Sequence, residues 1–527
     1  MKPPAGPAPP DPGGAAPGVG AGGGLERGSP STVPQGRERS LPVPPVAAPP
    51  VLFLFGIPVH NVSTEETLAW IASRARSGRA AQVVTSNLDF IMQAWRDPEM
   101  QRIHLDADLV VADGWPPVFF SRFFGPKLQG RVAGSDLVVR LGPFARDHGL
   151  SIYALGGKEG VAAEAMRLLG ERSPGLLVAG FSSPPQAKLL EMDHVGTSAH
   201  ISKRDPQVLL VAFGAPKQDK WIRINLHRLG APVALGIGAS LDFVAGVQTR
   251  APRWVQRLAM EWFWRLCSQP RRLFKRYSSN LLFLGTILFR LALVRCWPGG
   301  KSPGSPAPDP AGLKAQGATL ARFSALATPA DVEAFCAPLE SVAREGILVL
   351  DLSECSWLSS LDLGALARLA QASRSSGRRL LLSRVPGRTA RLLRLLRLDR
   401  WLDLPSSPSE WDRRLEELAA PLDQRRTRMG REGGALEIVL AEDFEGAEAA
   451  RVLGWISRPE ALADLERLTI DGGRLRFIDS SGLLLLQSAA TWASGREGRI
   501  LQLRAFPPQT LELLEREGLG ALAAGSR

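Results

Sequence analysis

Between Val51 and residue 249, six short and almost wholly apolar runs alternate with stretches whose apolar residues recur at helical spacing. The six runs are AQVVTSN, ADLVVAD, LSIYALGG, LLVAGFS, PQVLLVAFG and APVALGIG. A strand that is apolar on both sides must be covered on both sides, which is typical of a parallel sheet between two layers of helices. We therefore expect an α/β fold with a Rossmann-like parallel sheet, whose ligands bind at the carboxyl ends of its strands.

Two segments lack the bulky apolar residues that a core needs. Residues 1–50 and 298–314 are rich in Pro and Gly, so we expect a disordered tail and a linker. The four cysteines are scattered without a CxxC pair, which disfavours a zinc site or a disulfide framework. The N-terminus has no apolar segment of the secretory type, so we expect a cytoplasmic protein.

A basic appendage at residues 250–297 follows the predicted sheet domain, residues 51–249. It holds ten Arg or Lys residues but a single acidic residue, Glu261, and its charges are interleaved with Trp, Phe and Leu. In a chain of net charge +12, this amphipathic mixture favours an anionic membrane surface over nucleic acid as the partner. The apolar run Leu281–Phe289 ends at Arg290 and is shorter than the ~20 residues of a spanning helix, so it could lie in the interface.

Beyond the linker the chain repeats itself at a spacing of about 120 residues. The segment ILVLDLSECSWLSSLDLGALARLAQASRSSGRRLLL lines up with RLTIDGGRLRFIDSSGLLLLQSAATWASGREGRILQL. Each copy has the pattern strand, turn, helix, strand. We therefore expect two small homologous α/β domains, at residues 315–420 and 433–527.

Seven motifs in the first half occur in the order of one known family. They are VTSNLDF, ADLVVADGWP, RVAGSD, LGGKEG, FGAPKQDKW, LGIGASLDFVAG and RAPRWVQRLAMEWFWRL. Over most of residues 51–278 the chain resembles the WecG/TagA/CpsF glycosyltransferases. The resemblance implies an inverting enzyme of cell-surface polysaccharide synthesis. Such an enzyme moves an N-acetylmannosamine-type or related sugar from a UDP donor to an undecaprenyl-diphosphate-linked sugar.

Asp113 ends an apolar strand and precedes a glycine, which places a carboxylate at the mouth of the predicted crevice. A sugar hydroxyl must lose its proton to attack the anomeric carbon, and a positioned carboxylate takes that proton well. The resemblance implies this general-base role for Asp113, and the alternative is an Asp that caps a turn. Thr85 and Asn87 end the preceding strand, where the resemblance implies contacts to donor or acceptor hydroxyls and the alternative is turn formation.

Several other residues suit the phosphates of the substrates. Arg131 offers paired donors to a diphosphate. Gly156, Gly157 and Gly160 follow a strand and open a helix, where backbone amides can cradle nucleotide phosphates. The resemblance implies an active-site amide at Gln218, donor contacts at Gly214 and Lys217, and an appendage that completes the site over the lipid diphosphate through Arg250, Arg253 and Arg257. Alone, Arg131 and Lys217 could be solvated surface residues.

We expect neither a metal nor another cofactor. Asp106 and Asp108 form a DxD, the pattern that holds a divalent metal in many sugar transferases, but a helix-to-strand turn explains their position. The resembled family is not thought to need a metal.

The second repeat contains FIDSSGLLLLQSA, which resembles the signature of STAS domains of the anti-sigma-factor antagonist type. The resemblance implies that Ser480 is phosphorylated by a partner kinase and controls binding of a regulatory protein, and the alternative is an unmodified capping serine. In the first repeat Ser359, Ser360, Leu361 and Asp362 replace the Asp, Ser, Ser and Gly of this signature, so its phosphoregulation is doubtful.

The sequence thus predicts a sugar transferase on the inner face of the cell membrane, fused to a STAS tandem. The alternative is a non-catalytic transferase-like scaffold that acts through its STAS domains. A STAS-bearing anion transporter is disfavoured because the sequence has no series of spanning segments.

Overall fold

The computed structural model describes residues 49–230, 232–248, 270–296, 316–456 and 464–524, together with residues 252, 255, 264, 313, 314, 461 and 462. The described residues belong to one compact unit, Ser40–Arg527. The predicted tail, except residues 49 and 50, and the predicted linker, except residues 313 and 314, lie outside the described residues.

Six parallel strands form the central sheet, in the spatial order β4-β3-β8-β7-β5-β6. Each strand comes from one of the six predicted runs, so the α/β fold class is confirmed. The strands are β3 (Ala81–Ser86), β4 (Leu109–Ala112), β5 (Ser151–Gly156), β6 (Leu177–Ser182), β7 (Val208–Ala212) and β8 (Val233–Gly236). Strand β6 differs from the expected buried strand, because it lies at the sheet edge and exposes Leu177, Val178 and Phe181.

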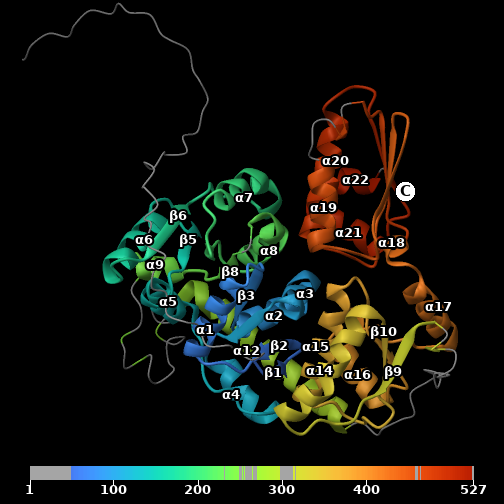
Figure 1. Cartoon of the computed structure of the whole chain (residues 1–527), viewed down its shortest axis with the longest axis horizontal. Helices are drawn as coiled ribbons and strands as arrows, with labels where there is room; N and C mark the ends of the chain where they lie inside the picture. The colour runs from blue at the N-terminus through green and yellow to red at the C-terminus, as the bar shows by residue number, and fades with distance from the viewer. Residues whose placement is uncertain are drawn as a thin grey trace, which may run out of the picture. The chain divides into compact units, whose positions relative to one another are not determined.

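Helices cover both faces of this sheet (Figure 1). One apolar cluster joins the sheet to helices α1, α5, α6 and α9, and other clusters join its opposite face to α2, α3, α7 and α8. The bounds are α1 (Thr64–Arg76), α2 (Leu88–Arg96), α3 (Pro98–Asp106), α4 (Trp115–Phe124), α5 (Gly134–His148), α6 (Val161–Arg172), α7 (His194–Ser202), α8 (Lys217–Asn225) and α9 (Ser240–Val244). We call residues 51–248 the sheet domain.

An antiparallel hairpin precedes the sheet, and the sequence analysis did not anticipate it. Strands β1 (Val51–Leu54) and β2 (Ile57–His60) pair through a tight turn at Phe55 and Gly56. Leu52, Leu54 and Ile57 are fully buried in it. The hairpin therefore belongs to the core rather than to the preceding tail.

Helix α12 (Pro270–Cys296) is longer than the apolar run in its sequence. Its segment Tyr277–Cys296 is long and apolar enough, by length and composition, to cross a membrane. The expectation of a segment too short to span is therefore wrong, because the helix continues past Arg290 for six more residues. One face of α12 buries Leu284 and Ile287 in the protein core, while its other face exposes Leu281, Leu282, Phe289 and further large apolar residues.

Two repeats of one architecture follow, as predicted. The first repeat consists of β9 (Ala318–Arg322), α14 (Pro329–Glu345), β10 (Ile347–Asp351), α15 (Ser360–Ser375), β11 (Leu381–Ser383) and α16 (Gly387–Leu395). The second consists of β13 (Ala435–Val439), α19 (Gly446–Ile456), β15 (Arg467–Asp471), α20 (Ser480–Ser494), β17 (Ile500–Arg504) and α21 (Pro508–Arg516). Their parallel strands have the equivalent orders β9-β10-β11 and β13-β15-β17.

The flanks of the two repeats differ. The second repeat carries an additional antiparallel edge strand, β12 (Arg428–Glu432), before its predicted start at residue 433. Helix α17 (Pro408–Ala419) and the short helix α18 (Leu422–Arg425) connect the two repeats.

The two repeats also differ in how they share cores with the sheet domain. Strands β1 and β2, helices α2 and α12 and one face of the first repeat's sheet contribute to one continuous apolar cluster, whereas the other face of that sheet packs on α17. The second repeat has its own cluster, to which the sheet domain adds the fully buried Ile224 and the half-buried Leu189 and Leu190. The first repeat is thus integrated with the sheet domain, whereas the second is a nearly independent body.

Candidate active site

Asp113 lies where the sequence predicts it, directly after strand β4. Its N–H donates to the Ser86 carbonyl at 2.9 Å, which joins it to the end of the neighbouring strand β3. Gly114 follows with φ +105°, and helix α4 begins at Trp115. The half-buried carboxylate therefore stands at the carboxyl edge of the sheet, at the mouth where open α/β sheets bind ligands.

Asn87 and Thr85 lie at the same edge, but the structure assigns both of them structural contacts. Asn87 caps helix α2, since its Oδ1 accepts from the N–H groups of Asp89 (2.9 Å) and Phe90 (3.3 Å). The Thr85 hydroxyl is buried and donates to the Gly236 carbonyl at 3.0 Å. Asn87 therefore orients α2, and Thr85 ties β3 to β8.

Gln218, the predicted active-site amide, is the second residue of helix α8 and is almost fully buried. Its Oε1 accepts from the N–H of Gly238 at 2.9 Å, in the loop that follows β8. A Cβ at Gly236 would lie 2.6 Å from Gln218 Nε2, so the Gln218 side chain packs directly on the backbone of β8. The motifs around Gln218 and Gly236 therefore meet beside the end of β3.

Lys217 and Gly214 flank this amide. The Lys217 ammonium donates to the Ala187 carbonyl at 2.5 Å and lies 5.3 Å from the centre of the Phe213 ring. Gly214 adopts φ +78°. Lys217 thus contacts the loop after β6, and burial lowers its pKa.

The glycine turn after β5 packs against strand β7. Gly157 donates its N–H to the Ala212 carbonyl at 3.1 Å. Gly156 adopts φ +102°, and a Cβ there would meet the Phe213 ring at 2.9 Å. Gly160 caps helix α6 with φ +78°. The turn therefore brings the start of α6 to the sheet edge, as a phosphate cradle requires, although the Gly157 amide is bonded within the protein.

Arg131 precedes helix α5 and lies 3.3 Å from Asp136 in the same motif. Gly134 begins α5, and a Cβ there would lie 3.5 Å from Ser240 Oγ and 3.7 Å from Thr85. The RVAGSD segment is thus packed on the ends of β3 and β8, so Arg131 comes from the same edge as Asp113.

Asp219 is a candidate that the sequence analysis missed. It follows Gln218 in α8, is fully buried, and a Cβ at Gly236 would lie 2.8 Å from its Oδ1. Burial raises the pKa of its carboxyl to about 7, against smaller lowering effects of its own backbone amide and of Gln218. A carboxyl that titrates near neutrality beside a crevice is a common property of functional sites. Its only sequence signal is its place within the KQDK motif.

Aromatic residues continue from Asp113 along helix α4. Trp115 stacks on Phe119 with ring centres 4.6 Å apart, and Phe119 contacts Phe123 edge-on. Trp115 is 43% exposed and Phe123 67% exposed. The candidate base is therefore bordered by an apolar surface of the kind that a lipid-linked substrate can contact.

The DxD carboxylates form ion pairs with arginines instead of facing each other. Asp108 pairs with Arg74 at 2.6 Å, and Asp106 pairs with Arg223 at 2.8 Å. Helix α3 ends at Asp106 and β4 begins at Leu109, which is the expected helix-to-strand turn. Within the part of the chain that the structure describes, no group of three or more His, Cys, Asp or Glu side chains could hold a metal ion.

Arg250, Arg253 and Arg257 lie outside the described residues, so their predicted contact to the lipid diphosphate stays a prediction.

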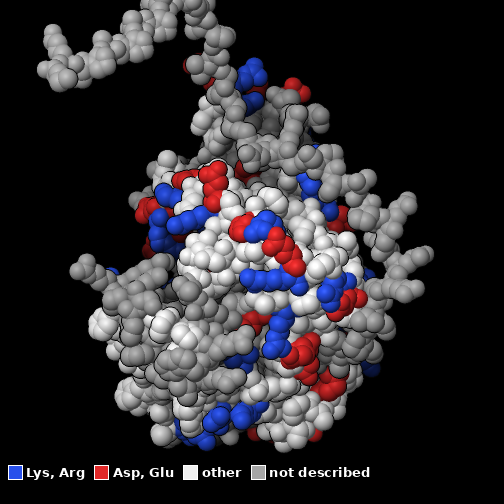
Figure 2. All heavy atoms as spheres, turned by 90° about the vertical axis from the view of Figure 1, so that its left-hand side faces the viewer, with Lys and Arg blue, Asp and Glu red and all other residues white. Residues whose placement is uncertain are grey.

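Figure 2 shows one face of the molecule, on which Lys and Arg are interspersed with Asp and Glu. A nucleic-acid backbone is usually bound by a clustered basic patch or stripe, which this mixed face does not resemble.

Ser480 is the first residue of helix α20, as the STAS signature predicts, and Asp479 is its N-cap. Its side chain is buried and its hydroxyl donates to Glu99 Oε2 at 2.7 Å. The equivalent helix of the first repeat, α15, begins at Ser360 with Ser359 as its N-cap. This confirms the alignment of the two repeats, and phosphorylation of Ser480 stays a prediction.

Two family models match separate parts of the chain. The model of the glycosyl transferase WecG/TagA/CpsF family matches residues 52–295, and a model described as Mlab, STAS domain, matches residues 322–405. The second match falls on the first repeat, so its altered signature does not remove the STAS character.

Two curated relatives are similar to part of the chain. An N-acetylglucosaminyldiphosphoundecaprenol N-acetyl-beta-D-mannosaminyltransferase of Bacillus subtilis (strain 168) is 29% identical over 208 residues, which cover 40% of this chain and 79% of the relative. A protein with the same description from Bacillus spizizenii (strain ATCC 23059 / NRRL B-14472 / W23) is 30% identical over 194 residues, which cover 37% of this chain and 74% of the relative.

Proposed function

The chain belongs to the WecG/TagA/CpsF family of glycosyltransferases, and from this membership we propose that it transfers an N-acetylmannosamine-type sugar from a UDP donor to a polyprenyl-diphosphate-linked acceptor. The names of both relatives describe a mannosaminyltransferase whose acceptor is N-acetylglucosaminyldiphosphoundecaprenol. The observation that best supports the proposal is the position of Asp113, a half-buried carboxylate between the end of the sheet and the exposed aromatic helix α4.

In the proposed reaction an acceptor hydroxyl attacks the anomeric carbon from the side opposite the UDP group. The new bond joins the hydroxyl oxygen to that carbon, the bond to the UDP oxygen breaks, and UDP leaves with the electron pair. Asp113 takes the hydroxyl proton, which is the role of a general base. The configuration at the anomeric carbon is thereby inverted.

The proposed roles of the other residues follow from their contacts. Gln218 holds the loop after β8 through Gly238, and Asn87 fixes the start of α2, so both would position the backbone at the edge where we propose that the donor binds. Arg131 is suited to the negative charge of a diphosphate, because its guanidinium presents paired donors. We propose no metal or other cofactor for this reaction.

We further propose that the protein is cytoplasmic and lies on the inner face of the cell membrane. The exposed apolar face of α12 and the exposed Trp115 and Phe123 support this. A peripheral position suits α12 better than a spanning one, because Leu284 and Ile287 on its other face are buried in the protein core. The predicted boundaries, with the sheet domain at 51–249, the appendage at 250–297 and the two repeats at 315–420 and 433–527, are part of this proposal.

The experiment that tests the proposal measures UDP release by the full chain. It uses a panel of UDP-sugars with a short-chain prenyl-diphosphate-GlcNAc acceptor, and a matched reaction without acceptor as the control. We expect acceptor-dependent release with one UDP-HexNAc donor. Equal release with and without acceptor, or none with any donor, would leave the non-catalytic scaffold as the better interpretation.

A further inference from the structure

Both repeats place the same signature serine against the sheet domain. In the first repeat, Ser360 Oγ donates to the Phe53 carbonyl at 2.9 Å and accepts from the Phe53 N–H at 2.6 Å. In the second, the Ser480 hydroxyl donates to Glu99 Oε2 at 2.7 Å and its N–H donates to Glu99 Oε1 at 3.0 Å. Both serines are 4% exposed. The signature position is therefore an intrachain contact in each repeat.

The contact of the first repeat is apolar and close. Gly364 in helix α15 lies so near strand β1 that a Cβ would be 2.5 Å from the Val51 carbonyl oxygen. The surrounding leucines of both parts belong to one core. Separation would expose this core to water, so the first repeat is a permanent part of the sheet domain.

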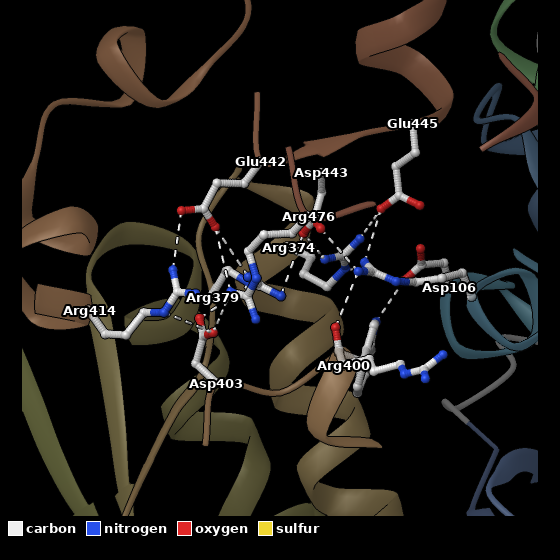
Figure 3. Close-up of polar contacts among 12 residues, drawn as sticks. Asp106, Arg374, Arg379, Arg400, Asp403, Arg414, Glu442, Asp443, Glu445 and Arg476 are labelled. Carbon is white, nitrogen blue, oxygen red and sulfur yellow. Dashed lines mark hydrogen bonds and ion pairs between the residues drawn. The ribbon is translucent and has the colours of Figure 1, made fainter. Parts of the chain in front are cut away.

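The contact of the second repeat is built mainly from charges. Arg102 of helix α3 pairs with Asp443 at 3.0 Å and with Glu445 at 3.2 Å, and Arg223 of α8 lies 3.7 Å from Glu445. Figure 3 shows how Asp106 of the sheet domain and Arg374 of the first repeat join the same network. Buried ion pairs orient a contact more than they strengthen it, because desolvation offsets much of their attraction.

Three carboxylates, those of Glu99, Asp479 and Glu445, lie around Ser480, and Lys220 pairs with Glu99. The Glu99 carboxylate accepts hydrogen bonds from the hydroxyl and the N–H of Ser480, and the N-cap Asp479 lies beside Glu99 and Glu445. Burial, together with these two neighbouring carboxylates, raises the pKa of Asp479 to about 7. A cavity of about 580 Å³ borders this contact, and both acidic and basic side chains line it, among them Glu99, Lys220 and Arg102. A negative charge added at Ser480 would meet carboxylates that already repel one another.

Helix α8 connects this contact to the candidate active site. Lys220 in its middle pairs with Glu99 at 2.8 Å and with Asp97 at 2.7 Å. Gln218, two residues earlier, holds the loop after β8. Glu99, which accepts the hydrogen bonds of Ser480, therefore also forms the ion pair with Lys220 of helix α8.

We propose that the second repeat, residues 428–524, is a releasable regulatory lobe that docks on helices α3 and α8 through Ser480 and thereby restrains Gln218. A negative charge at Ser480 releases the lobe. Because the hydroxyl is buried when docked, a kinase reaches it only in the undocked state, and the phosphate then keeps the lobe undocked. The effect on transfer rests on the proposed function, whereas docking itself does not.

Amide hydrogen exchange of the full chain tests the docking. Ser480→Asp should make the amides of helix α3 and of the start of α20 exchange about tenfold faster or more, as expected when hydrogen bonds to a buried charged group are lost. Ser494→Asp, at the exposed end of the same helix, is the matched control and should change neither segment.

A rescue variant distinguishes release from general destabilisation. In Glu99→Gln with Ser480→Asp the repulsion from residue 99 is gone and the amide can donate to the new carboxylate, so exchange in α3 should return toward the unmodified value. Unchanged exchange in Ser480→Asp, or equal exchange in the single and double variants, would overturn the docking. Strand β7 should stay protected in every variant, because faster exchange there would indicate unfolding of the sheet domain and not release.

Transfer kinetics of the same variants test the coupling. Ser480→Asp should change KM for the donor more than kcat, whereas Ser494→Asp should leave both unchanged. Altered exchange with unaltered KM would overturn the coupling to Gln218. Absence of transfer by the unmodified chain would contradict the proposed function while leaving the docking result standing.

Discussion

Replacement of Gly364 by alanine should strongly destabilise the joint between the first repeat and the sheet domain. The added Cβ would lie 2.5 Å from the Val51 carbonyl oxygen, about 0.9 Å closer than ordinary contact. The atom it meets belongs to the backbone of β1 and cannot rotate away, so the strand and helix α15 must separate. The separation would stretch both hydrogen bonds of Ser360 to Phe53 beyond bonding distance.

The magnitude follows from these two losses. Two hydrogen bonds at about 1 kcal/mol each and overpacking of about 1–3 kcal/mol give a loss of about 3–5 kcal/mol. Thermal and denaturant unfolding of the full chain, followed by circular dichroism, measures it. Gly170→Ala is the matched control, because a Cβ in that helical position meets nothing within 4 Å. It should be neutral or stabilising by up to ~1 kcal/mol. A Gly364→Ala protein as stable as the unmodified chain would refute the shared core.

Three further predictions concern the candidate site and the membrane. Asp113→Asn should keep the fold and lower UDP release about 10²- to 10⁴-fold, and near-normal turnover by the folded variant would remove Asp113 from the mechanism. The pKa of Asp219 is about 7 in the folded chain and near 3.8 in an unfolded one, so between these values the folded chain holds an extra proton and stability rises as the pH falls. Denaturant unfolding at pH 5 and pH 7.5 should show this slope, to which Asp219 contributes at most about 1.4 kcal/mol per pH unit. Asp219→Asn should lose this contribution and keep that of Asp479, whose pKa burial also raises to about 7. An identical pH dependence in both proteins would contradict the burial effect. Sedimentation with anionic liposomes should weaken as salt is raised, because salt screens surface charge attraction, and salt-independent binding would favour insertion of α12.

The six sheet strands could be predicted because each is apolar on both faces, a pattern that needs no knowledge of distant residues. The hairpin Val51–His60 could not, since part of the packing of its strand β1 comes from a helix that begins at Ser360. The apolar run in the sequence ends at Arg290, so the sequence predicted too short a segment. The helix itself continues to Cys296, because a charged side chain that reaches solvent does not end a helix.

The sequence predicted where the candidate site residues lie in the fold but not which contacts they make. Asp113 and Gln218 stand at the predicted edge because strand ends are readable from the sequence. The sequence does not show which polar side chains form hydrogen bonds with the backbone. Thr85 and Asn87 do so, to Gly236 and Asp89. Asp219 escaped notice because its raised pKa depends on burial by residues far away in the chain. The contact between Ser480 and Glu99 has no local sequence signal at all.

The hydrogen bonds between Phe53 and Ser360 join residues 307 positions apart. A ribosome that adds roughly 5–20 residues per second needs about 15–60 s to synthesise that length of chain. Throughout this interval the apolar strand β1 has left the ribosome without helix α15 to cover it. The N-terminal hairpin therefore completes its packing only after helix α15 of the first repeat has been made.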